Sequence, residues 1–431
     1  MKKSKFSQYD LLEIATISKK ISGLLIQELE KEGIVIKLAS GYNMFIKKDE
    51  IKDIKLVKKA KQAKQAAVVK ISHSKNLPTI SILHTGGTVA AKVDYRTGAV
   101  SAHFSPSELL SMFPELKKIA NIQSNLVFQM FSEDLEPEHW SILTKQIEKE
   151  IKSGVKGIII THGTDTMSYT AAALSFMIQD PPIPIILTGA QRSSDRASSD
   201  SALNLICSAQ FIAKTNFKGV AICMHATEED DACFIHQGTK AKKMHTSRRD
   251  SFRSINVLPI AKVHPNGDIT FLRSDYNKEG KLKVNTNFEK RVAIVKMRPG
   301  FNPKELSVYD NYKGLIIEGT GLGHAPINSI DKYTKHHKEL LAKLAKLSKK
   351  MPIVITSQSP YGRTNLNVYS TGRDLQSAGV ISGLDMLTET AYTKLGWLLG
   401  NIKDVEKVKK EMQNNYVGEI AEVIEDRAFL Y

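Results

Sequence analysis

Two short segments of the chain combine glycines with hydroxyl side chains, a combination that could support nucleophilic chemistry. Residues 84–88 read His-Thr-Gly-Gly-Thr, and residues 161–166 read Thr-His-Gly-Thr-Asp-Thr. Glycine lets backbone N–H groups approach a ligand closely, and a threonine hydroxyl can attack a carbonyl carbon once its proton is removed. Either segment alone is more typical of a tight turn or a helix N-cap. Together they indicate a candidate active site.

A threonine nucleophile needs a group that takes its proton and donors that stabilise the negative oxygen formed on attack. Asp165 and a nearby lysine could fill the first role, and free backbone N–H groups of a glycine-containing turn at a helix start could fill the second. Lys240, Lys242 and Lys243 lie in one polar segment. Chemistry alone does not choose among these lysines, since any of them could equally be a solvated surface charge.

The elements that must position these groups alternate between apolar runs of strand length and helical stretches from Thr79 onwards, which predicts a mainly parallel α/β sheet. The expected strands are residues 80–83, 157–160, 183–187, 220–224, 292–295, 315–317 and 353–355. Ligands bind beyond the carboxyl ends of such strands. The two glycine-containing segments each follow an expected strand, so both should lie at the same edge of the sheet.

Three helices between these strands carry sequence signals. A Ser-Pro-Ser-Glu capping box at residues 105–108 predicts one helix start, and Pro137 opens a second helix that Gly154 can close. The third expected helix covers residues 168–177, directly after the second glycine-containing segment.

The chain before this α/β region has a different pattern. Short apolar runs at residues 23–26, 34–36 and 44–46 are separated by polar turn residues, which predicts a small SH3-like β-barrel. We therefore expect three parts. They are a β-barrel module with its Lys/Ala/Gln-rich linker at residues 1–75, a larger α/β domain with the candidate site at residues 76–280, and a smaller α/β domain at residues 290–431.

Positive charge is concentrated in the first part. The 431-residue chain has a formal net charge of +16, and its first 75 residues contain 17 lysines against 8 carboxylates. Such a basic lobe fits contact with an anionic partner such as RNA, because lysine and arginine drive binding by neutralising phosphates. A solvated lysine-rich surface would have the same composition, so charge alone leaves both interpretations open.

Composition also limits the class of protein. The three cysteines, Cys207, Cys223 and Cys233, form no Cys-x-x-Cys pair, which favours a reducing compartment over a disulfide framework. No apolar run approaches the roughly 20 residues that span a bilayer. We therefore expect a cytoplasmic protein without membrane contact. The sequence contains no P-loop and no Cys/His cluster with zinc spacing, so we expect no ATP site and no metal site in this chain.

Several motifs resemble those of a known family. Residues 85–90, Thr-Gly-Gly-Thr-Val-Ala, and residues 161–167 closely resemble the two signatures of bacterial-type L-asparaginases, and residues 189–192, Gly-Ala-Gln-Arg, resemble a later loop of that family. The resemblance covers roughly residues 78–431. It implies two asparaginase-like α/β domains with parallel sheets, and hydrolysis of side-chain amides through an acyl-enzyme on threonine.

The resemblance assigns catalytic roles by motif. Thr88 would be the nucleophile, and Tyr95 would assist it from a mobile loop. A second set, Thr164, Asp165 and Lys243, would move protons, with Lys243 chosen by the motif Lys-Met-His-Thr-Ser that it begins.

Substrate contacts are implied in the same way. Ser132 and Asp165 would hold the α-carboxylate and α-amino groups, and Glu133, Gly87 and Gly163 would complete the substrate site. Free asparaginases typically have glutamine at the place of Glu133. A carboxylate there changes the charge that faces the substrate, so we expect weaker action on free asparagine.

This departure and the basic N-terminal module make the chain similar to the GatD subunits of the archaeal glutamyl-tRNA(Gln) amidotransferases. Residues 243–250 and 365–370 share in that resemblance. It implies a ligase complex in which this subunit releases ammonia from glutamine or asparagine. A GatE-type partner would bind Glu-tRNA(Gln), use ATP and Mg²⁺, and receive the ammonia, while this chain would carry no cofactor. A homodimer within a heterotetramer is the implied assembly.

Two alternatives remain from the sequence. The chain could be a free L-asparaginase with an N-terminal extension, although Glu133 and the basic module argue against this hypothesis. It could instead be a catalytically idle scaffold that holds RNA or a protein. The scaffold hypothesis predicts the loss of a required catalytic residue, and every residue that the resemblance requires is present.

Overall fold

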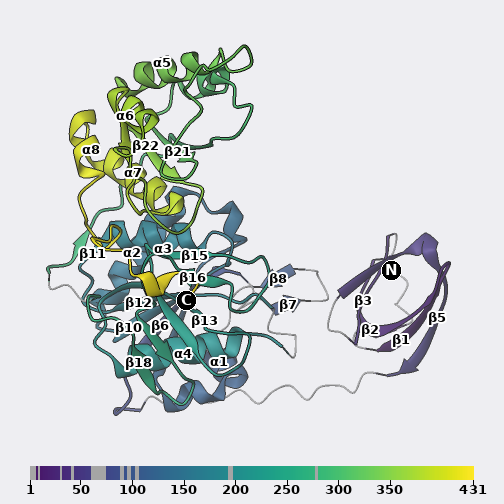
Figure 1. Cartoon of the computed structure of the whole chain (residues 1–431). Helices are drawn as coiled ribbons and strands as arrows, with labels where there is room; N and C mark the ends of the chain where they lie inside the picture. Colours follow the sequence, from purple (N-terminus) through teal and green to yellow (C-terminus); the bar gives the residue numbers. More distant parts are fainter. Residues whose placement is uncertain are drawn as a thin grey trace.

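The computed structural model of the chain describes residues 6–7, 10–29, 32–39, 43–59, 74–87, 92–94, 99–101, 106–192, 198–276 and 280–431. Three main sheets organise these residues (Figure 1). Thr88 and Tyr95, the expected nucleophile and its assistant, lie outside the described residues.

The first sheet is antiparallel and has the order β4-β3-β2-β1-β5. Its strands are β1 (Leu11–Thr16), β2 (Lys20–Leu29), β3 (Gly33–Lys37), β4 (Asn43–Lys47) and β5 (Ile51–Lys58). Its own apolar cluster includes Leu12, Leu25 and Ile36. The expected β-rich module is confirmed. No ladder joins β4 to β5 among the described residues, so closure into a barrel stays a prediction.

The second sheet has eight strands in the order β18-β17-β14-β13-β12-β10-β6-β9. They are β6 (Thr79–Gly86), β9 (Asn121–Met130), β10 (Gly157–Thr161), β12 (Pro184–Thr188), β13 (Gly219–His225), β14 (Cys233–Gln237), β17 (Ala261–Val263) and β18 (Ile269–Phe271). The neighbouring strands β9, β6, β10, β12 and β13 run parallel to one another. Strands β14, β17 and β18 pair in antiparallel fashion. The chain goes from β6 to β9 on one side and then to β10 on the other side. The point between β6 and β10 is therefore a topological switch point, where α/β sheets bind ligands.

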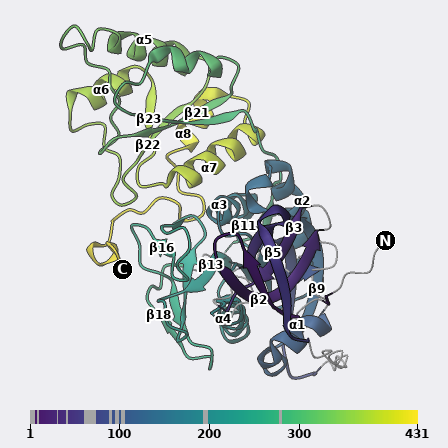
Figure 2. The ribbon, with the colours of Figure 1, turned by 90° about the vertical axis from the view of Figure 1, so that its right-hand side faces the viewer.

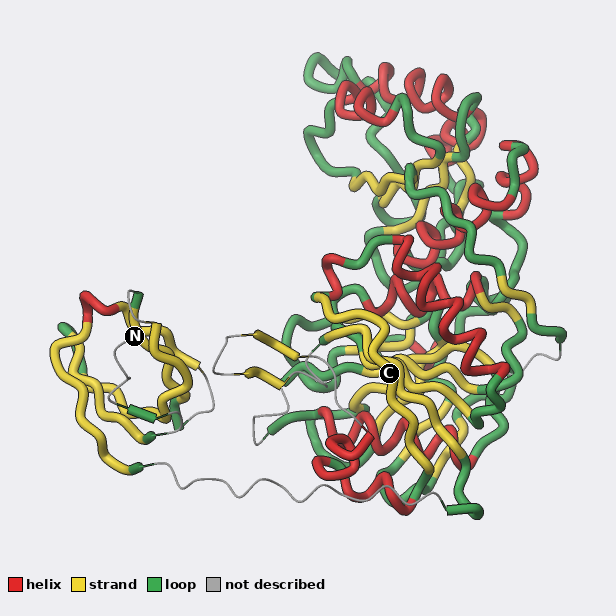
Figure 3. Tube along the Cα trace, turned by 180° about the vertical axis from the view of Figure 1, so that it is seen from behind, coloured by secondary structure: helices red, strands yellow, loops and turns green. Residues whose placement is uncertain are grey.

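Helices cover both faces of this sheet (Figure 3). One apolar cluster packs α2 (Pro137–Lys152) and α3 (Met167–Met177) on one face, and another packs α1 (Pro106–Met112) and α4 (Ser201–Lys214) on the other. The predicted helix starts at Pro106 and Pro137 are confirmed. Gly154 follows the end of α2 with φ +83°, a left-handed conformation that favours glycine.

The third sheet is parallel, with the order β20-β21-β22-β23. Its elements are β20 (Val292–Lys296), β21 (Gly314–Gly319), β22 (Ile353–Ser357), β23 (Val380–Ser382), α5 (His337–Ser348), α6 (Ser370–Ser377), α7 (Thr388–Asn401) and α8 (Val405–Glu411). Helices α5 and α6 cover one face, and α7 covers the other. The α/β class expected for both domains is confirmed, with a mixed sheet in the larger domain and a parallel sheet in the smaller one.

Helix α7 joins the two α/β parts. Helix α7 lies next to α3 in Figure 2. A single buried cluster runs from Ile158 of β10 through α3 and α7 to Ile316 of β21. Phe176 of α3 stacks on Trp397 of α7 with ring centroids 6.0 Å apart. Among the described residues, no helix is long and apolar enough to cross a membrane.

Candidate active site

The two glycine-containing segments meet at the switch point. Thr161 of β10 pairs with His84 of β6, so the loops that follow both strands start side by side. Gly87 has φ +79°, and a Cβ atom there would lie 2.6 Å from the backbone nitrogen of Gly163. Only glycine fits such a close approach of two backbones without a shift. Thr88, the expected nucleophile, is the next residue in the sequence after Gly87.

A third loop closes against the first two. Ser132 lies in η4 (Ser132–Asp134), just after β9, and is buried. A Cβ atom on Gly163 would lie 2.7 Å from Ser132 Cβ, so this glycine also permits close packing. Thr166 Oγ1 donates a hydrogen bond of 2.7 Å to the Ser132 carbonyl. Thr166 is the N-cap residue of α3, but its side chain makes no capping hydrogen bond among the described residues. Thr166 thus fixes the expected α-carboxylate-binding loop, a role that no sequence pattern indicated.

Lys243 connects Thr164 with Asp165. Its Nζ donates to Thr164 Oγ1 at 2.8 Å and to Asp165 Oδ1 at 2.7 Å. The Lys243 and Thr164 side chains are largely buried, whereas the Asp165 side chain is 67% exposed. Asp165 can therefore face both the lysine and a ligand. The structure brings together the three members of the expected Thr-Asp-Lys set.

The other two lysines of this segment have different partners. Lys240 is fully buried and forms an ion pair of 2.5 Å with Asp385. Lys242 pairs with Glu389 of α7. Among the described residues, Lys243 is thus the lysine of this segment that reaches Thr164 and Asp165.

Glu133 is exposed beside Ser132, and Ser132 Oγ donates to Glu133 Oε2 at 3.5 Å. A carboxylate at this position places a group that can only accept hydrogen bonds near the expected substrate carboxylate. Like charges repel, and the expected difference from free asparaginases at Glu133 stays a prediction.

The two histidines of the glycine-containing segments are buried packing groups. His84 Nδ1 lies 3.0 Å from Thr161 Oγ1, and its Nε2 lies 2.9 Å from Ser124 Oγ. His162 Nδ1 lies 2.6 Å from the Gly163 carbonyl, which makes Nδ1 the protonated nitrogen. Burial lowers the pKa of His162 to about 4. His162 is therefore neutral at pH 7 and holds the loop in place.

We expect acid to destabilise the fold through buried histidines. Burial lowers the pKa of His162 to about 4 and that of His236 to about 3, against about 6.5 in an unfolded chain. The unfolded state then binds more protons below pH 6.5, so stability is full above pH 6.5 and falls as the pH drops toward 4. The loss for His162 is about 3 kcal/mol. Urea unfolding between pH 7.5 and 4.5 measures it.

The control compares His236→Gln with His336→Gln, which changes a partly exposed histidine of the smaller domain. The first substitution should flatten the pH dependence of the unfolding free energy, and the second should leave it unchanged. If the unfolding free energy depended on pH equally in both variants, the acid destabilisation could not be assigned to the buried histidines.

A fourth strand-end loop, the one after β12, is held by a buried carboxylate. Asp200 accepts hydrogen bonds from the backbone N–H groups of Gln191 and Arg192 at 2.9–3.0 Å, and from Asn204 Nδ2 at 3.1 Å. Asn204 Nδ2 also donates to the Gly189 carbonyl. The hydrogen bonds of Asp200 and Asn204 therefore hold the Gly-Ala-Gln-Arg loop after β12 in place. No sequence pattern indicates this role of Asp200, because its partners are mainly backbone groups.

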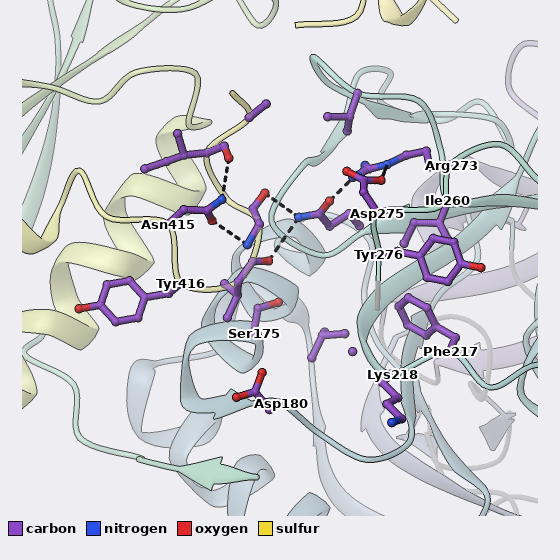
Figure 4. A pocket seen from close by; sticks show the side chains of 18 of the residues that line it. Ser175, Asp180, Phe217, Lys218, Ile260, Arg273, Asp275, Tyr276, Asn415 and Tyr416 are labelled. Atoms are coloured by element: carbon purple, nitrogen blue, oxygen red, sulfur yellow. Dashed lines mark hydrogen bonds and ion pairs between the residues drawn. The ribbon is translucent and has the colours of Figure 1, made fainter. Parts of the chain in front are cut away.

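A cavity lies elsewhere in the molecule (Figure 4). It has a volume of about 540 Å³ and is lined by Phe217, Lys218, Arg273, Tyr276 and most of the segment 415–423. Phe217 and Lys218 precede β13, so the cavity lies at the amino ends of the parallel strands, opposite to the candidate site. Some of its polar groups bond to one another: Arg273 donates to Gln237, and Gln237 donates to the Gly418 carbonyl. The cavity lies where the C-terminal segment packs against the larger domain.

Comparisons with known proteins agree with this geometry. Residues 79–276 match the family model of the asparaginase N-terminal domain, and residues 291–412 match that of the glutaminase/asparaginase C-terminal domain. The chain is 47% identical to the glutamyl-tRNA(Gln) amidotransferase GatD subunit of Pyrococcus furiosus over 406 residues, which cover 93% of this chain and 90% of that protein. The chain belongs to the GatD family. Its identity to the GatD of Thermococcus kodakarensis is also 47%, over 90% of this chain and 87% of the relative.

Solved structures show the wider family. The L-asparaginase of Thermococcus kodakarensis superposes with a TM-score of 0.71 at 30% identity, over 80% of this chain and 99% of that enzyme. L-asparaginase I of Vibrio cholerae gives a TM-score of 0.68 at 28% identity, over 80% of this chain and 99% of that enzyme. This GatD family member therefore has an asparaginase-like α/β fold.

Proposed function

We propose that the chain is the amide-hydrolysing subunit of a tRNA-dependent amidotransferase, and that it releases ammonia from glutamine or asparagine. The observation that carries this proposal is the contact of Lys243 with Thr164 and Asp165, beside the glycine from which the chain enters Thr88. A threonine, a carboxylate and a lysine at the switch point of the sheet form a set that hydrolyses amides, and the GatD relatives are named for amide transfer.

The reaction has two steps. Thr88 Oγ attacks the carboxamide carbon, its proton passes to the departing nitrogen through the Thr164-Asp165-Lys243 set, and the C–N bond breaks to release ammonia. Water then attacks the acyl-enzyme ester and restores the Thr88 hydroxyl, giving glutamate or aspartate. Tyr95 assists the nucleophile, and the Gly87 and Gly163 region lies against the reacting carbonyl.

The partner and its cofactors complete the proposal. The ammonia is used by a GatE-type subunit that binds Glu-tRNA(Gln) and activates the glutamate with ATP and Mg²⁺. This chain supplies ammonia as a homodimer within a heterotetramer. The name of the relatives supports a multi-subunit enzyme, since it describes one subunit of an amidotransferase.

A free L-asparaginase is the second candidate, because the superposed solved structures are asparaginases. The alignment with the Pyrococcus furiosus relative argues against it. Residues 79–431 make up about four fifths of the chain, so an alignment that covers 93% must include part of the N-terminal module. The GatD relatives share that module in part.

Ammonia release from glutamine and from asparagine separates the two candidates. We expect weak release by the purified chain alone and strong stimulation when the GatE-type partner and Glu-tRNA(Gln) are added. High release by the chain alone, unchanged by either addition, would instead identify a free asparaginase.

The substitution Glu133→Gln tests the specificity of the site. Removing the carboxylate removes its repulsion of the substrate carboxylate, so we expect kcat/KM for free asparagine to rise about 10-fold, which equals roughly 1.4 kcal/mol. Steady-state ammonia assays with asparagine measure it. Glu136→Gln is the matched control, because Glu136 is an exposed carboxylate just before α2. An unchanged kcat/KM for Glu133→Gln would refute this role.

A further inference from the structure

The strand that carries the catalytic lysine is short. It is β15 (Ala241–Lys243), and its one ladder among the described residues is with β16 (Phe252–Ser254). A two-stranded ribbon has few ladder bonds of its own, so contacts outside the ladder, such as the burial of Ala241 and Phe252, hold it in place. Successive side chains of a strand point to opposite faces, so Lys242 and Lys243 leave β15 in opposite directions. Whatever fixes Lys242 therefore also fixes the face that Lys243 presents.

The start of α7 in the smaller domain supplies that support. Thr390 Oγ1 donates to the Thr239 carbonyl at 2.7 Å, just before β15. Asp385 pairs with Lys240, and Glu389 pairs with Lys242. Contacts to α7 and the residues before it thus fall at residues 239, 240 and 242 of the segment, while Lys243 extends to Thr164 of the larger domain.

Glu389 is unusual because most of its side chain is buried. It is 14% exposed, and Lys242 is 26% exposed. Glu389 Oε2 is buried and has no hydrogen-bond partner among the described residues, so Lys242 is the main described partner of this carboxylate. Burying a carboxylate is costly unless it is paired. The pair therefore holds both side chains in one arrangement.

We infer that Glu389 is a positioning residue for the catalytic lysine: it holds Lys242 on the α7 side of β15 and thereby directs Lys243 toward Thr164 and Asp165. This inference rests on the proposed function, in which Lys243 moves protons. It assigns the smaller domain a part in catalysis through α7, at a residue that does not touch the substrate.

The substitution Glu389→Gln tests the inference in the complete complex with partner and Glu-tRNA(Gln). We expect kcat for ammonia release to fall about 10-fold, because a misplacement of about 1 Å costs as much as 100-fold. KM for the amide should change less than about 2-fold, since the substrate contacts remain. A loss that merely reflected unfolding would instead appear as a lower melting temperature with unchanged kcat per folded molecule.

Three further variants make the test specific. Lys242→Met removes the same ion pair by changing its other partner, and it should lower kcat by the same factor. The exchange Lys242→Glu with Glu389→Lys should restore at least half of the lost kcat. Glu138→Gln breaks an ion pair with Lys290, away from β15, and should leave kcat unchanged.

The outcomes separate the two proposals. Wild-type complex that releases no ammonia from either amide would refute the proposed function. Wild-type release with full kcat in both Glu389→Gln and Lys242→Met would refute the positioning role alone, as would a Glu138→Gln variant that loses kcat to the same extent.

Discussion

Ammonia release should fall by about 10³-fold or more when Thr88 is replaced by alanine, because removing the attacking group of a covalent mechanism removes the main reaction path. The described residues show what surrounds Gly87, the residue before Thr88. Gly87, which precedes Thr88, contacts the Gly163 backbone, and Gly163 borders both Ser132 and the loop that carries Thr164. Three strand-end loops therefore converge on the residue before Thr88.

The measurement is ammonia release from glutamine and asparagine by the complex with partner and Glu-tRNA(Gln). Thr88→Ser is the matched control, because it keeps the hydroxyl and should retain measurable activity. The melting temperature of both variants should stay within a few degrees of that of the wild type. Unchanged ammonia output from Thr88→Ala would remove Thr88 from the nucleophile role.

Much of the fold could be predicted because the central strands are covered on both faces. All five residues of β10 are buried, so the strand appears in the sequence as an uninterrupted apolar run. Strand β9 lies at the edge of the sheet and has mostly exposed or half-buried residues, so its sequence lacks such a run and we did not predict it. Strand β5 was missed for the same reason, since most of its side chains are exposed.

The candidate site was only partly predictable from the residues themselves. The two glycine-containing loops could be placed at one edge of the sheet by the rule for parallel strands. The choice among Lys240, Lys242 and Lys243 could not be made, because it depends on the pleat of β15 and on distant partners. Thr164 lies 79 residues from Lys243, and Asp385 lies 145 residues from Lys240. Only the resemblance indicated Lys243 beforehand.

We expect the buried ion pair between Lys240 and Asp385 to stabilise the fold without taking part in catalysis. Both side chains are fully buried, and Asp385 Oδ1 also accepts a hydrogen bond of 3.0 Å from the Ala421 backbone. Burial lowers the pKa of Lys240, and the carboxylate of Asp385 opposes that change. The pair thus ties the segment before β15 to the smaller domain without reaching Thr164 or Asp165.

We expect Asp385→Asn to lower the free energy of unfolding by about 3–5 kcal/mol, because it leaves the Lys240 ammonium buried without its counter-charge. The Ala421 hydrogen bond can persist on the asparagine oxygen, so the loss reports the charge. Urea unfolding at pH 7.5 measures it. The double variant Lys240→Met with Asp385→Asn removes both charges and should recover most of the stability, since an apolar side chain of similar length replaces the lysine. If Asp385→Asn alone unfolds within about 1 kcal/mol of the wild type, the pair does not hold the domains together, and the support of β15 must come from Glu389 and Thr390 alone.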